Sequence, residues 1–354
     1  MSEHPSLTEA VRLPSPDADH TAPRVAVLGA GSWGTTFAKV LADGGADVLI
    51  WARRRAVAHA ITETHRNSGY LPGINLPRNL RGHDSLEHVL AGAEQVYLSV
   101  PSQSLRSNLA SIRDILPPDV PVVSLMKGVE RGTGLRMSEV IEQELRVERH
   151  RIAVVSGPNL ALEIAKREPT AAVVASESHE TAVAVASVSS NDYFRSFVNT
   201  DVIGTEFGGV LKNLIAVAVG IADGVGYGEN TKASIITRGL VELSAFAVAF
   251  GARPETMIGL AGLGDLIATC ESPLSRNNTA GRLLGQGYGF EQVIAQMNQT
   301  AEGLASVGPI LELAETRGVS MPIVAQVAQV LEGTLDPREL APHLATDSDE
   351  PQAE

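Results

Sequence analysis

The chain of 354 residues has little cysteine and few aromatic side chains. Its single cysteine, Cys270, excludes a disulfide within the chain and fits a reducing compartment. No apolar run reaches the roughly 20 residues that cross a bilayer. The first 23 residues carry four acidic side chains and lack the apolar segment of a secretory signal. We therefore expect a cytoplasmic protein without membrane insertion.

Positive charge is also scarce. Lys and Arg number 28 against 41 Asp and Glu, which gives a formal net charge of −13 at pH 7. Nucleic-acid-binding surfaces are basic, so nucleic acid is not expected as a partner. The nine histidines and the one cysteine show none of the usual metal-ligand spacings, so no metal is expected. An acidic protein that binds anions must gather its few cations in a pocket.

A glycine pattern follows the first apolar segment. Gly29, Gly31 and Gly34 form G-x-G-x-x-G directly after residues 25–28. In such a turn the first glycine permits the tight bend and the second lets backbone approach a pyrophosphate, while the third lets the helix pack on the strand. A helix over 35–43 and a second strand over 48–51 complete the expected context. The pattern predicts a dinucleotide site, with an ordinary strand-to-helix turn as the alternative.

The end of the second strand indicates which dinucleotide is bound. An NAD site usually has Asp or Glu there, to hydrogen-bond the ribose 2′-hydroxyl. This chain has Arg53, Arg54 and Arg55 instead. Guanidinium groups suit a 2′-phosphate through their charge and forked donors. The sequence favours NADP(H) and leaves NAD(H) open; a solvated basic helix start is the alternative reading.

The remaining pattern predicts two domains. Apolar segments over 94–100, 121–125, 152–155, 170–175 and 194–199 alternate with helical stretches, and 67–82 is expected to be a loop. This order indicates an α/β fold with a Rossmann-type doubly wound, mostly parallel sheet. Helical patterns alone continue after Thr205, which predicts an all-helical C-terminal domain. The expected organisation is a disordered tail over 1–23, a dinucleotide-binding domain over 24–204, a helical substrate domain over 205–336 and an acidic flexible tail over 337–354.

Two lysines stand at informative places. Lys127 follows the strand over 121–125, at the sheet edge where ligands of such folds bind. Lys212 is the one charged residue of the apolar stretch 207–219. A buried amine is costly unless it is paired or deprotonated, and a general base must lose its proton near neutral pH. We interpret Lys212 as catalytic; a lysine that snorkels from a helix edge is the alternative.

Two further segments carry polar chemistry. Asp265 follows a glycine-rich turn, where it either caps the next helix or orients the lysine or a substrate hydroxyl. Thr269 lies four residues on and shares its helix face. Ser275, Arg276 and Asn277 bring hydroxyl, guanidinium and amide donors together in a cluster that suits an anion. A plain polar loop is the alternative for that cluster.

Together these segments resemble the bacterial NAD(P)-dependent glycerol-3-phosphate dehydrogenase family. The resemblance covers about residues 24–335, in family order and spacing. The matching segments are Gly29-Ala-Gly-Ser-Trp-Gly-Thr35, Lys127-Gly128, Ser156-Gly157-Pro158, Gly208–Asn213, Ile235–Leu240, Gly262–Asp265 and Ser275–Asn277. The resemblance implies reduction of dihydroxyacetone phosphate to sn-glycerol 3-phosphate with NAD(P)H, which feeds phospholipid synthesis. It also implies a homodimer.

The resemblance further implies roles for individual residues. The catalytic residues are Lys212, as proton acceptor in the oxidation direction, with Lys127 and Asp265. The cofactor residues are Gly29, Gly31, Ser32, Trp33, Gly34, Arg53, Arg54, Lys127, Gly157, Ala161, Arg276 and Glu302. The substrate residues are Lys127, Gly157, Lys212, Asn213, Asp265, Thr269, Ser275, Arg276 and Asn277. Many members have Ser or Thr where this chain has Asn159, which leaves its side-chain role open.

Two other functions remain as alternatives. Hydroxyacid and ketopantoate reductases also combine a Rossmann domain with a helical domain and a catalytic lysine, and their substrates end in a carboxylate. A non-catalytic dinucleotide sensor would bind NADPH and need neither Lys212 nor Asp265. Turnover of a phosphorylated against a carboxylated ketone separates these functions.

Overall fold

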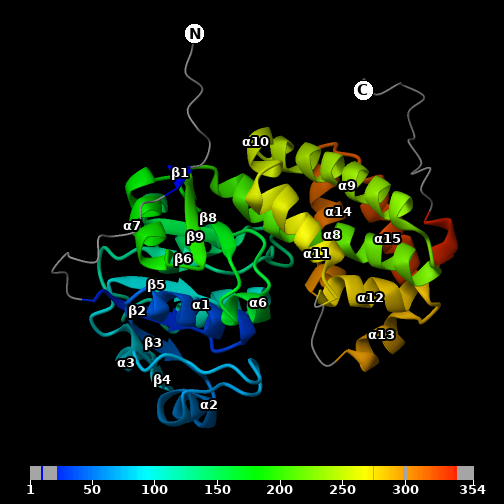
Figure 1. Cartoon of the computed structure of the whole chain (residues 1–354). Helices are drawn as coiled ribbons and strands as arrows, with labels where there is room; N and C mark the ends of the chain where they lie inside the picture. Colours follow the sequence, from blue (N-terminus) through cyan, green and yellow to red (C-terminus); the bar gives the residue numbers. More distant parts are fainter. Residues whose placement is uncertain (1–8, 11–21, 274, 298–301, 341–354) are drawn as a thin grey trace. The chain divides into compact units, whose positions relative to one another are not determined.

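The computed structural model describes residues 9–10, 22–273, 275–297 and 302–340. The chain divides into two compact units, residues 1–206 and 207–354, here named the sheet unit and the helical unit (Figure 1). Most residues of the two predicted tails, 1–8, 11–21 and 341–354, lie outside the described part.

The described residues of the sheet unit form a nine-stranded sheet of order β1-β9-β8-β7-β6-β5-β2-β3-β4. Its pairings are parallel except for β7 with β8 and β1 with β9, which are antiparallel. The prediction of a doubly wound, mostly parallel sheet is therefore confirmed. The strands are β1 (Glu9–Ala10), β2 (Arg24–Leu28), β3 (Asp47–Trp51), β4 (Leu80–His83), β5 (Gln95–Leu98), β6 (Val122–Ser124), β7 (Ile152–Ser156), β8 (Thr170–Ser176) and β9 (Phe194–Asn199).

Helices cover both faces of this sheet, so its central strands are apolar throughout. One core gathers Val25 and Val27 of β2 with Phe37 of α1. The other gathers Ala26 and Leu28 of β2 with residues of α4 and α5. The helices and short turns are α1 (Ser32–Asp43), α2 (Arg55–His59), η1 (Ala60–Thr64), α3 (Leu86–Leu90), η2 (Ser102–Ser104), α4 (Leu105–Ala110), α5 (Met137–Leu145), η3 (Arg149–Arg151), α6 (Ala161–Ala165) and α7 (His179–Ser189).

The sheet extends one strand further than the sequence predicts. Residues 67–82 were expected to be a loop, but β4 begins at Leu80 and pairs in parallel with β3. In this edge strand Leu80 is buried and Arg81 is exposed, so it lacks the apolar run by which inner strands are recognised. At the other end of the sheet, Glu9–Ala10 of the predicted N-terminal tail pairs with β9.

The described residues of the helical unit contain helices and turns and no strand. Its elements are α8 (Val202–Val225), α9 (Glu229–Ala249), α10 (Pro254–Met257), η4 (Leu260–Gly264), α11 (Asp265–Glu271), α12 (Arg276–Gly285), α13 (Phe290–Gln296), α14 (Glu302–Thr316), α15 (Pro322–Glu332) and η5 (Pro337–Glu339). Helix α8 begins in the sheet unit and continues into this one. Figure 1 shows α8 among α9, α11, α12 and α14.

Helix α8 is the apolar centre of the helical unit. Its 24 residues have the length and composition of a membrane span, with a mean hydropathy of 1.5, although the sequence shows only shorter uninterrupted apolar runs. However, 94% of that apolar window is buried inside the fold, as in the core helix of a globular unit. Lys212 therefore lies on a helix with almost no contact to water.

Candidate active site

The glycine-rich turn between β2 and α1 needs two of its glycines for packing and leaves the third open. Gly29 has φ +117°, and a Cβ there would lie 2.2 Å from the carbonyl oxygen of Ser99. A Cβ on Gly34 would lie 2.0 Å from the carbonyl oxygen of Gly29. At Gly31 a Cβ would meet nothing within 4 Å. Backbone at Gly31 is thus open to a ligand, which fits the approach of a pyrophosphate.

The start of α1 is arranged to receive an anion. The N-cap is Gly31, and no side chain caps the helix there, so its first amides are left to another acceptor. Ser32 and Trp33 brace this end, since the Ser32 hydroxyl donates to the Tyr70 carbonyl at 3.1 Å and Trp33 Nε1 donates to the Leu125 carbonyl at 3.1 Å. The helix begins at Ser32, three residues earlier than predicted.

Two residues of the loop 67–79, which the sequence did not predict as part of the site, support this turn. Asn67 is buried, and its Nδ2 donates to the Ala30 carbonyl at 3.0 Å and to Thr35 Oγ1 at 2.8 Å. The Tyr70 hydroxyl accepts from Arg54 Nη2 at 3.3 Å, and the guanidinium carbon lies 5.7 Å from the ring centroid. Arg53 and Arg54 are exposed at the end of β3. The available signal for Tyr70 was an aromatic residue in a loop of a chain with few aromatics.

Lys127 and Gly157, thirty positions apart in the chain, meet at the ends of β6 and β7. Lys127 is half-buried, and its Nζ donates to the Gly157 carbonyl at 3.1 Å. Gly157 has φ +136°, and a Cβ there would lie 3.2 Å from Ala172 Cα, so the turn lies flat on β8. Ala161 begins α6, and its carbonyl accepts from Thr36 Oγ1 of α1 at 3.1 Å. The predicted sheet-unit residues thus cluster along one edge.

Asn159 lies in the same turn. Both polar atoms of its side chain are buried, and neither has a hydrogen-bond partner among the described residues. A buried amide without a partner costs about 1–3 kcal/mol. The one position at which this chain departs from its resemblance is therefore also a position with unused hydrogen-bonding capacity.

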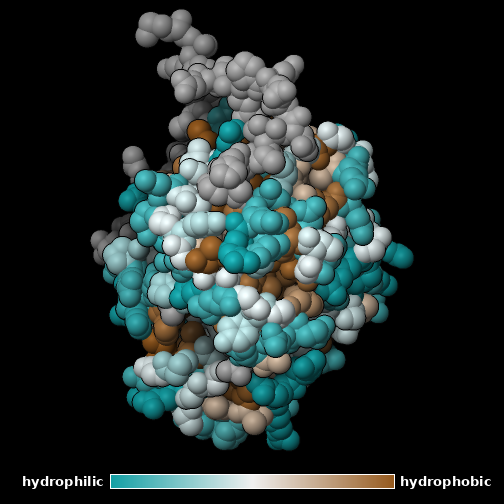
Figure 2. Space-filling model, turned by 90° about the vertical axis from the view of Figure 1, so that its right-hand side faces the viewer, coloured by the Kyte–Doolittle hydropathy of each residue, from teal (hydrophilic) through white to brown (hydrophobic). Residues whose placement is uncertain are grey.

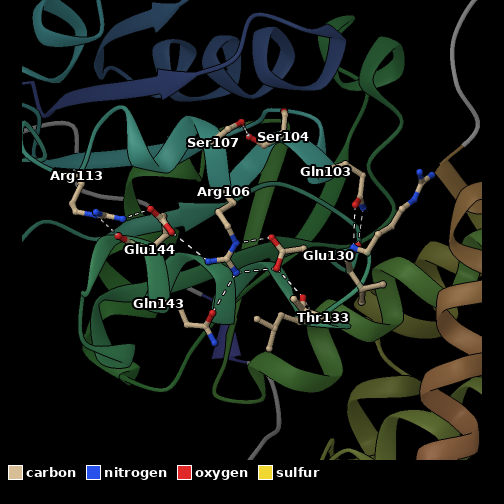
Figure 3. A network of polar contacts seen from close by, with 12 residues as sticks. Gln103, Ser104, Arg106, Ser107, Arg113, Glu130, Thr133, Gln143 and Glu144 are labelled. Carbon is tan, nitrogen blue, oxygen red and sulfur yellow. Dashed lines mark hydrogen bonds and ion pairs between the residues drawn. The ribbon is translucent and has the colours of Figure 1, made fainter.

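A polar network fixes the segment that follows Lys127 (Figure 3). Arg106 of α4 holds Glu130 with two bonds, Nε to Oε1 at 2.8 Å and Nη2 to Oε2 at 2.9 Å. The hydrogen bond from Arg106 keeps the pKa of Glu130 below its ordinary value despite partial burial. Gln103 accepts from the Arg131 amide at 3.0 Å and donates to the Val129 carbonyl at 2.8 Å. The network fixes the hairpin of residues 128–136, which begins directly after Lys127.

Lys212 lies in a buried polar constellation of the helical unit. It is 7% exposed, and its Nζ donates to the carboxylate of Asp265 and to Thr269 Oγ1, the latter at 2.6 Å. Asp265 is 1% exposed. Thr269 Oγ1 in turn donates to the Asp265 carbonyl at 2.7 Å. The amine therefore faces a carboxylate and a hydroxyl inside the fold and does not snorkel.

Asp265 is not the N-cap residue of its helix. The N-cap of α11 is Gly264, and no side chain caps the helix there. Asp265 is instead paired with Lys212 across 53 positions of sequence. The geometry thus supports the orienting interpretation of Asp265 over the capping one.

The cluster at the start of α12 lies beside the Lys212 turn. Ser275 caps α12, since its Oγ accepts from the Asn278 amide at 3.2 Å. Asn277 is buried and its Oδ1 accepts from the Gly303 amide at 3.0 Å. A Cβ on Gly303 would lie 2.7 Å from Asn277 Oδ1 and 3.0 Å from the Asn213 carbonyl oxygen. Asn213, Asn277 and the start of α14 therefore meet.

Two further predicted site residues, Arg276 and Glu302, lie at the first positions of helices. Arg276 is exposed at the first position of α12. Glu302 begins α14, but its side chain lies outside the described part of the chain.

The described residues form no cluster of metal ligands, and the one cysteine is not a reactive thiol. Within the described residues, no three His, Cys, Asp or Glu side chains come together as a metal site. Burial raises the pKa of Cys270 to about 12, although the nearby Lys212 opposes this. The thiol is therefore protonated at neutral pH and is a poor nucleophile.

Comparison with known proteins places these residues in context. The chain matches the family models described as NAD-dependent glycerol-3-phosphate dehydrogenase N-terminus, over residues 24–182, and C-terminus, over residues 201–342. It is 72% identical over 328 residues to the glycerol-3-phosphate dehydrogenase (NAD(P)+) of Leifsonia xyli, which covers 93% of this chain and 89% of that protein.

Solved structures of the same family are also similar to this chain. The crystal structure of glycerol-3-phosphate dehydrogenase from Coxiella burnetii has a TM-score of 0.84 at 34% identity, and covers 90% of this chain and 97% of that one. A ketopantoate reductase from Ralstonia eutropha has a TM-score of 0.55 at 17% identity, and covers 88% of this chain and 99% of that one. The second likeness shows a shared fold alone.

Proposed function

The chain belongs to the NAD-dependent glycerol-3-phosphate dehydrogenase family, and from this premise we propose how its residues carry out the reaction. The enzyme interconverts dihydroxyacetone phosphate and sn-glycerol 3-phosphate and thereby supplies the glycerol phosphate of phospholipids. The observation that carries the mechanism is the buried constellation of Lys212, Asp265 and Thr269.

The sheet unit binds the dinucleotide. When bound, NAD(P)H supplies a hydride to C2 of the ketone, and NAD(P)+ accepts it in the reverse direction. The open backbone at Gly31 and the uncapped start of α1 hold the pyrophosphate. Arg53 and Arg54 hold the 2′-phosphate, Arg54 being braced against Tyr70.

Other residues hold the nicotinamide end. The turn that carries Gly157 and Ala161 lines it, and we add the unused amide of Asn159 as a ligand contact. Arg276 and Glu302 remain proposed cofactor residues on the resemblance alone.

The helical unit handles the proton. In the oxidation direction Lys212 accepts the proton of the C2 hydroxyl, and in the reduction direction it returns this proton to the oxygen that becomes the hydroxyl. Asp265 and Thr269 hold its Nζ in place while its charge changes. Lys127 stabilises the negative charge that develops on the carbonyl oxygen.

The start of α12 binds the substrate phosphate. Ser275, Arg276 and the amides of the first helical turn supply hydroxyl, guanidinium and N–H donors, and Asn277 holds this end against α14. Binding at the phosphate lies away from the reacting carbon, so it contributes by holding C2 in position.

One pair of assays tests the proposal. The oxidation of NADPH and of NADH, followed separately with dihydroxyacetone phosphate, is expected to show turnover with both and a preference for NADPH, because arginines follow β3. Ketopantoate, which ends in a carboxylate, should not compete with dihydroxyacetone phosphate. Turnover of ketopantoate alone would favour the reductase function, and NADPH binding without turnover would favour a dinucleotide sensor.

We also propose that the enzyme is a cytoplasmic homodimer. The exposed face of α9 carries the uncharged side chains of Ser234, Thr237, Val241, Ala245 and Val248. Val241 and Val248 are 52% and 42% exposed, and Ile258 nearby in the chain is 64% exposed. Figure 2 looks onto the helical unit and shows apolar residues interrupting its hydrophilic surface. Exposed apolar faces of this kind are typical of protein interfaces. Light scattering should give the mass of two chains, and Val241→Arg should reduce it to one.

A further inference from the structure

Helices α8 and α12 touch through glycines along their crossing. On the α8 side, a Cβ on Gly220 would lie 2.2 Å from the carbonyl oxygen of Asn278. One turn later, a Cβ on Gly224 would lie 2.2 Å from the carbonyl oxygen of Arg282. Atoms in ordinary contact are about 3.5–4.0 Å apart. The backbone of α12 therefore occupies the space that any larger side chain would need.

The α12 side mirrors this arrangement. A Cβ on Gly281 would lie 2.1 Å from the carbonyl oxygen of Val217, and one on Gly285 would lie 2.2 Å from that of Ile221. The obstructing atoms belong to backbone, so no rotamer change relieves them. Since Gly281 faces Val217 and Gly285 faces Ile221, the two helices run in the same direction.

Polar contacts reinforce the crossing. Arg282 of α12 forms an ion pair with Asp223 of α8 at 3.1 Å, and its Nη2 donates to Asn278 Oδ1 at 3.0 Å. Asn278 Nδ2 donates to the Cys270 carbonyl at 3.0 Å, which ties α12 to α11, the helix that carries Asp265. The spacing of the three helices is therefore fixed by direct contacts.

The crossing lies next to the reacting groups. Lys212 precedes Val217 by five residues on α8, and Arg276 precedes Gly281 by five residues on α12, which is about 7.5 Å along each helix. Because the helices are parallel, Lys212 and Arg276 lie toward the same end. Gly303, which adjoins both Asn213 and Asn277, shows independently that these ends are neighbours.

We propose that the glycine crossing of α8 and α12, formed by Gly220, Gly224, Gly281 and Gly285, selects substrate length by fixing the distance between Lys212 and the phosphate-binding start of α12. The inference rests on the proposed function, in which Lys212 exchanges the proton at C2 and the α12 start holds the phosphate. In dihydroxyacetone phosphate one methylene separates the carbonyl carbon from the phosphate ester. A crossing set by backbone contact accepts this length and disfavours a longer one.

The test inserts a methyl group into the crossing. In Gly281→Ala the helices must separate by roughly 1.4–1.9 Å to restore ordinary contact, and a displacement of about 1 Å can already cost about 10²-fold in rate. The two substrates are dihydroxyacetone phosphate and its homologue with one more methylene, 4-hydroxy-3-oxobutyl phosphate. We expect kcat/KM for dihydroxyacetone phosphate to fall about 10²-fold and the ratio of the two kcat/KM values to shift about tenfold toward the homologue.

The matched control is Gly308→Ala. Gly308 lies in α14, is exposed, and has no atom within 4 Å of an added Cβ. Both kcat/KM values should stay within about twofold of those of the original enzyme, because the added methyl group meets no neighbouring helix. A folded Gly281→Ala with an unchanged ratio of the two substrates would overturn the inference.

Thermal melting will reveal whether Gly281→Ala folds. If it does not fold, a second variant tests the same inference. Arg282→Gln removes the ion pair with Asp223 and leaves all four glycines in place. We expect a shift of the ratio in the same direction, about two- to threefold, and an unchanged ratio in this folded variant also contradicts the inference. Lack of turnover of dihydroxyacetone phosphate by the original enzyme would instead refute the proposed function, so the two failures are distinguishable.

Discussion

The two units hold a buried glutamate in different ways. In the sheet unit, Glu206 is 5% exposed and accepts from Arg136 Nη1 at 2.6 Å and from the Ser138 amide at 2.9 Å. Burial pushes the pKa of Asp43 upward, but the hydrogen bonds from Arg167, Lys39 and Tyr193 together outweigh it and leave this pKa below its ordinary value. Cations thus contact both of these buried acidic groups of the sheet unit.

In the helical unit, Glu242 of α9 is 7% exposed and accepts from the backbone amides of Ile323 at 2.7 Å and Val324 at 3.4 Å. Burial raises the pKa of Glu242 to about 7, and the two amides only partly oppose this. Lys212 in the same unit faces Asp265 and Thr269. The sheet unit therefore pairs Glu206 and Asp43 with cations, whereas the helical unit holds Glu242 by two backbone amides.

The largest expected effect comes from removing the buried amine of the helical unit, Lys212. Lys212→Ala should lower kcat about 10³-fold, because general acid–base groups contribute about 10²–10⁴-fold. The dissociation constant for NADPH should stay close to its original value, because the proposed pyrophosphate and 2′-phosphate contacts belong to the sheet unit. Stopped-flow turnover and fluorescence titration measure the two quantities. Near-normal kcat would remove Lys212 from the mechanism.

A smaller effect is expected from the proposed phosphate-binding end of the helical unit. Arg276→Ala should lower kcat/KM for dihydroxyacetone phosphate about 10²-fold, because a charge-assisted bond to phosphate is lost. Arg276→Lys serves as the control and should recover part of the loss, since it keeps the charge without the forked donors. Steady-state kinetics of both variants decides, and an unchanged kcat/KM in the alanine variant would place the phosphate elsewhere.

The different environment of Glu242 can be tested through the pH dependence of the free energy of unfolding. A carboxyl group whose pKa is about 7 when folded and 4.5 when unfolded binds more protons in the folded state between these values. Its contribution to the free energy of unfolding is therefore present below pH 4.5 and is lost as the pH rises to 7. Between pH 5 and pH 8, Glu242→Gln should gain about 2 kcal/mol relative to the original chain.

Urea unfolding at several pH values measures this difference. The control is Glu255→Gln, whose carboxylate is exposed on α10 and should show no such pH dependence. A constant difference between the Glu242→Gln variant and the original chain from pH 5 to pH 8 would show that the pKa of Glu242 does not lie in this range.

Much of the fold could be predicted from local sequence. Strands buried on both faces must be apolar over their length, so β2, β3 and β5 were recognisable, whereas β4 at the edge was not. A single charge in the apolar stretch 207–219 drew attention to Lys212 for the same reason, because only a paired amine is tolerated there.

What could not be predicted depends on contacts between distant segments. The support that Asn67 and Tyr70 give to the glycine-rich turn joins residues more than thirty positions apart. The contact of Gly220 with the backbone of α12 likewise could not be predicted locally, because a glycine in a helix does not indicate which segment packs against it. Local pattern predicted the proposed reacting groups, and the structure added the contacts between distant segments that surround them.

The smallest expected effect tests whether the Arg106–Glu130 pair of the sheet unit matters for catalysis. Arg106→Met removes both bonds to Glu130 and should loosen the hairpin that follows Lys127, lowering kcat/KM about tenfold. Arg106→Lys should recover part of this loss. If Arg106 acts by positioning Lys127, the methionine substitution should have little further effect in a Lys127→Ala background, because the group that it positions is gone. Fully additive losses in that double-mutant cycle would show that the Arg106–Glu130 pair supports the sheet unit in general and has no specific connection to Lys127.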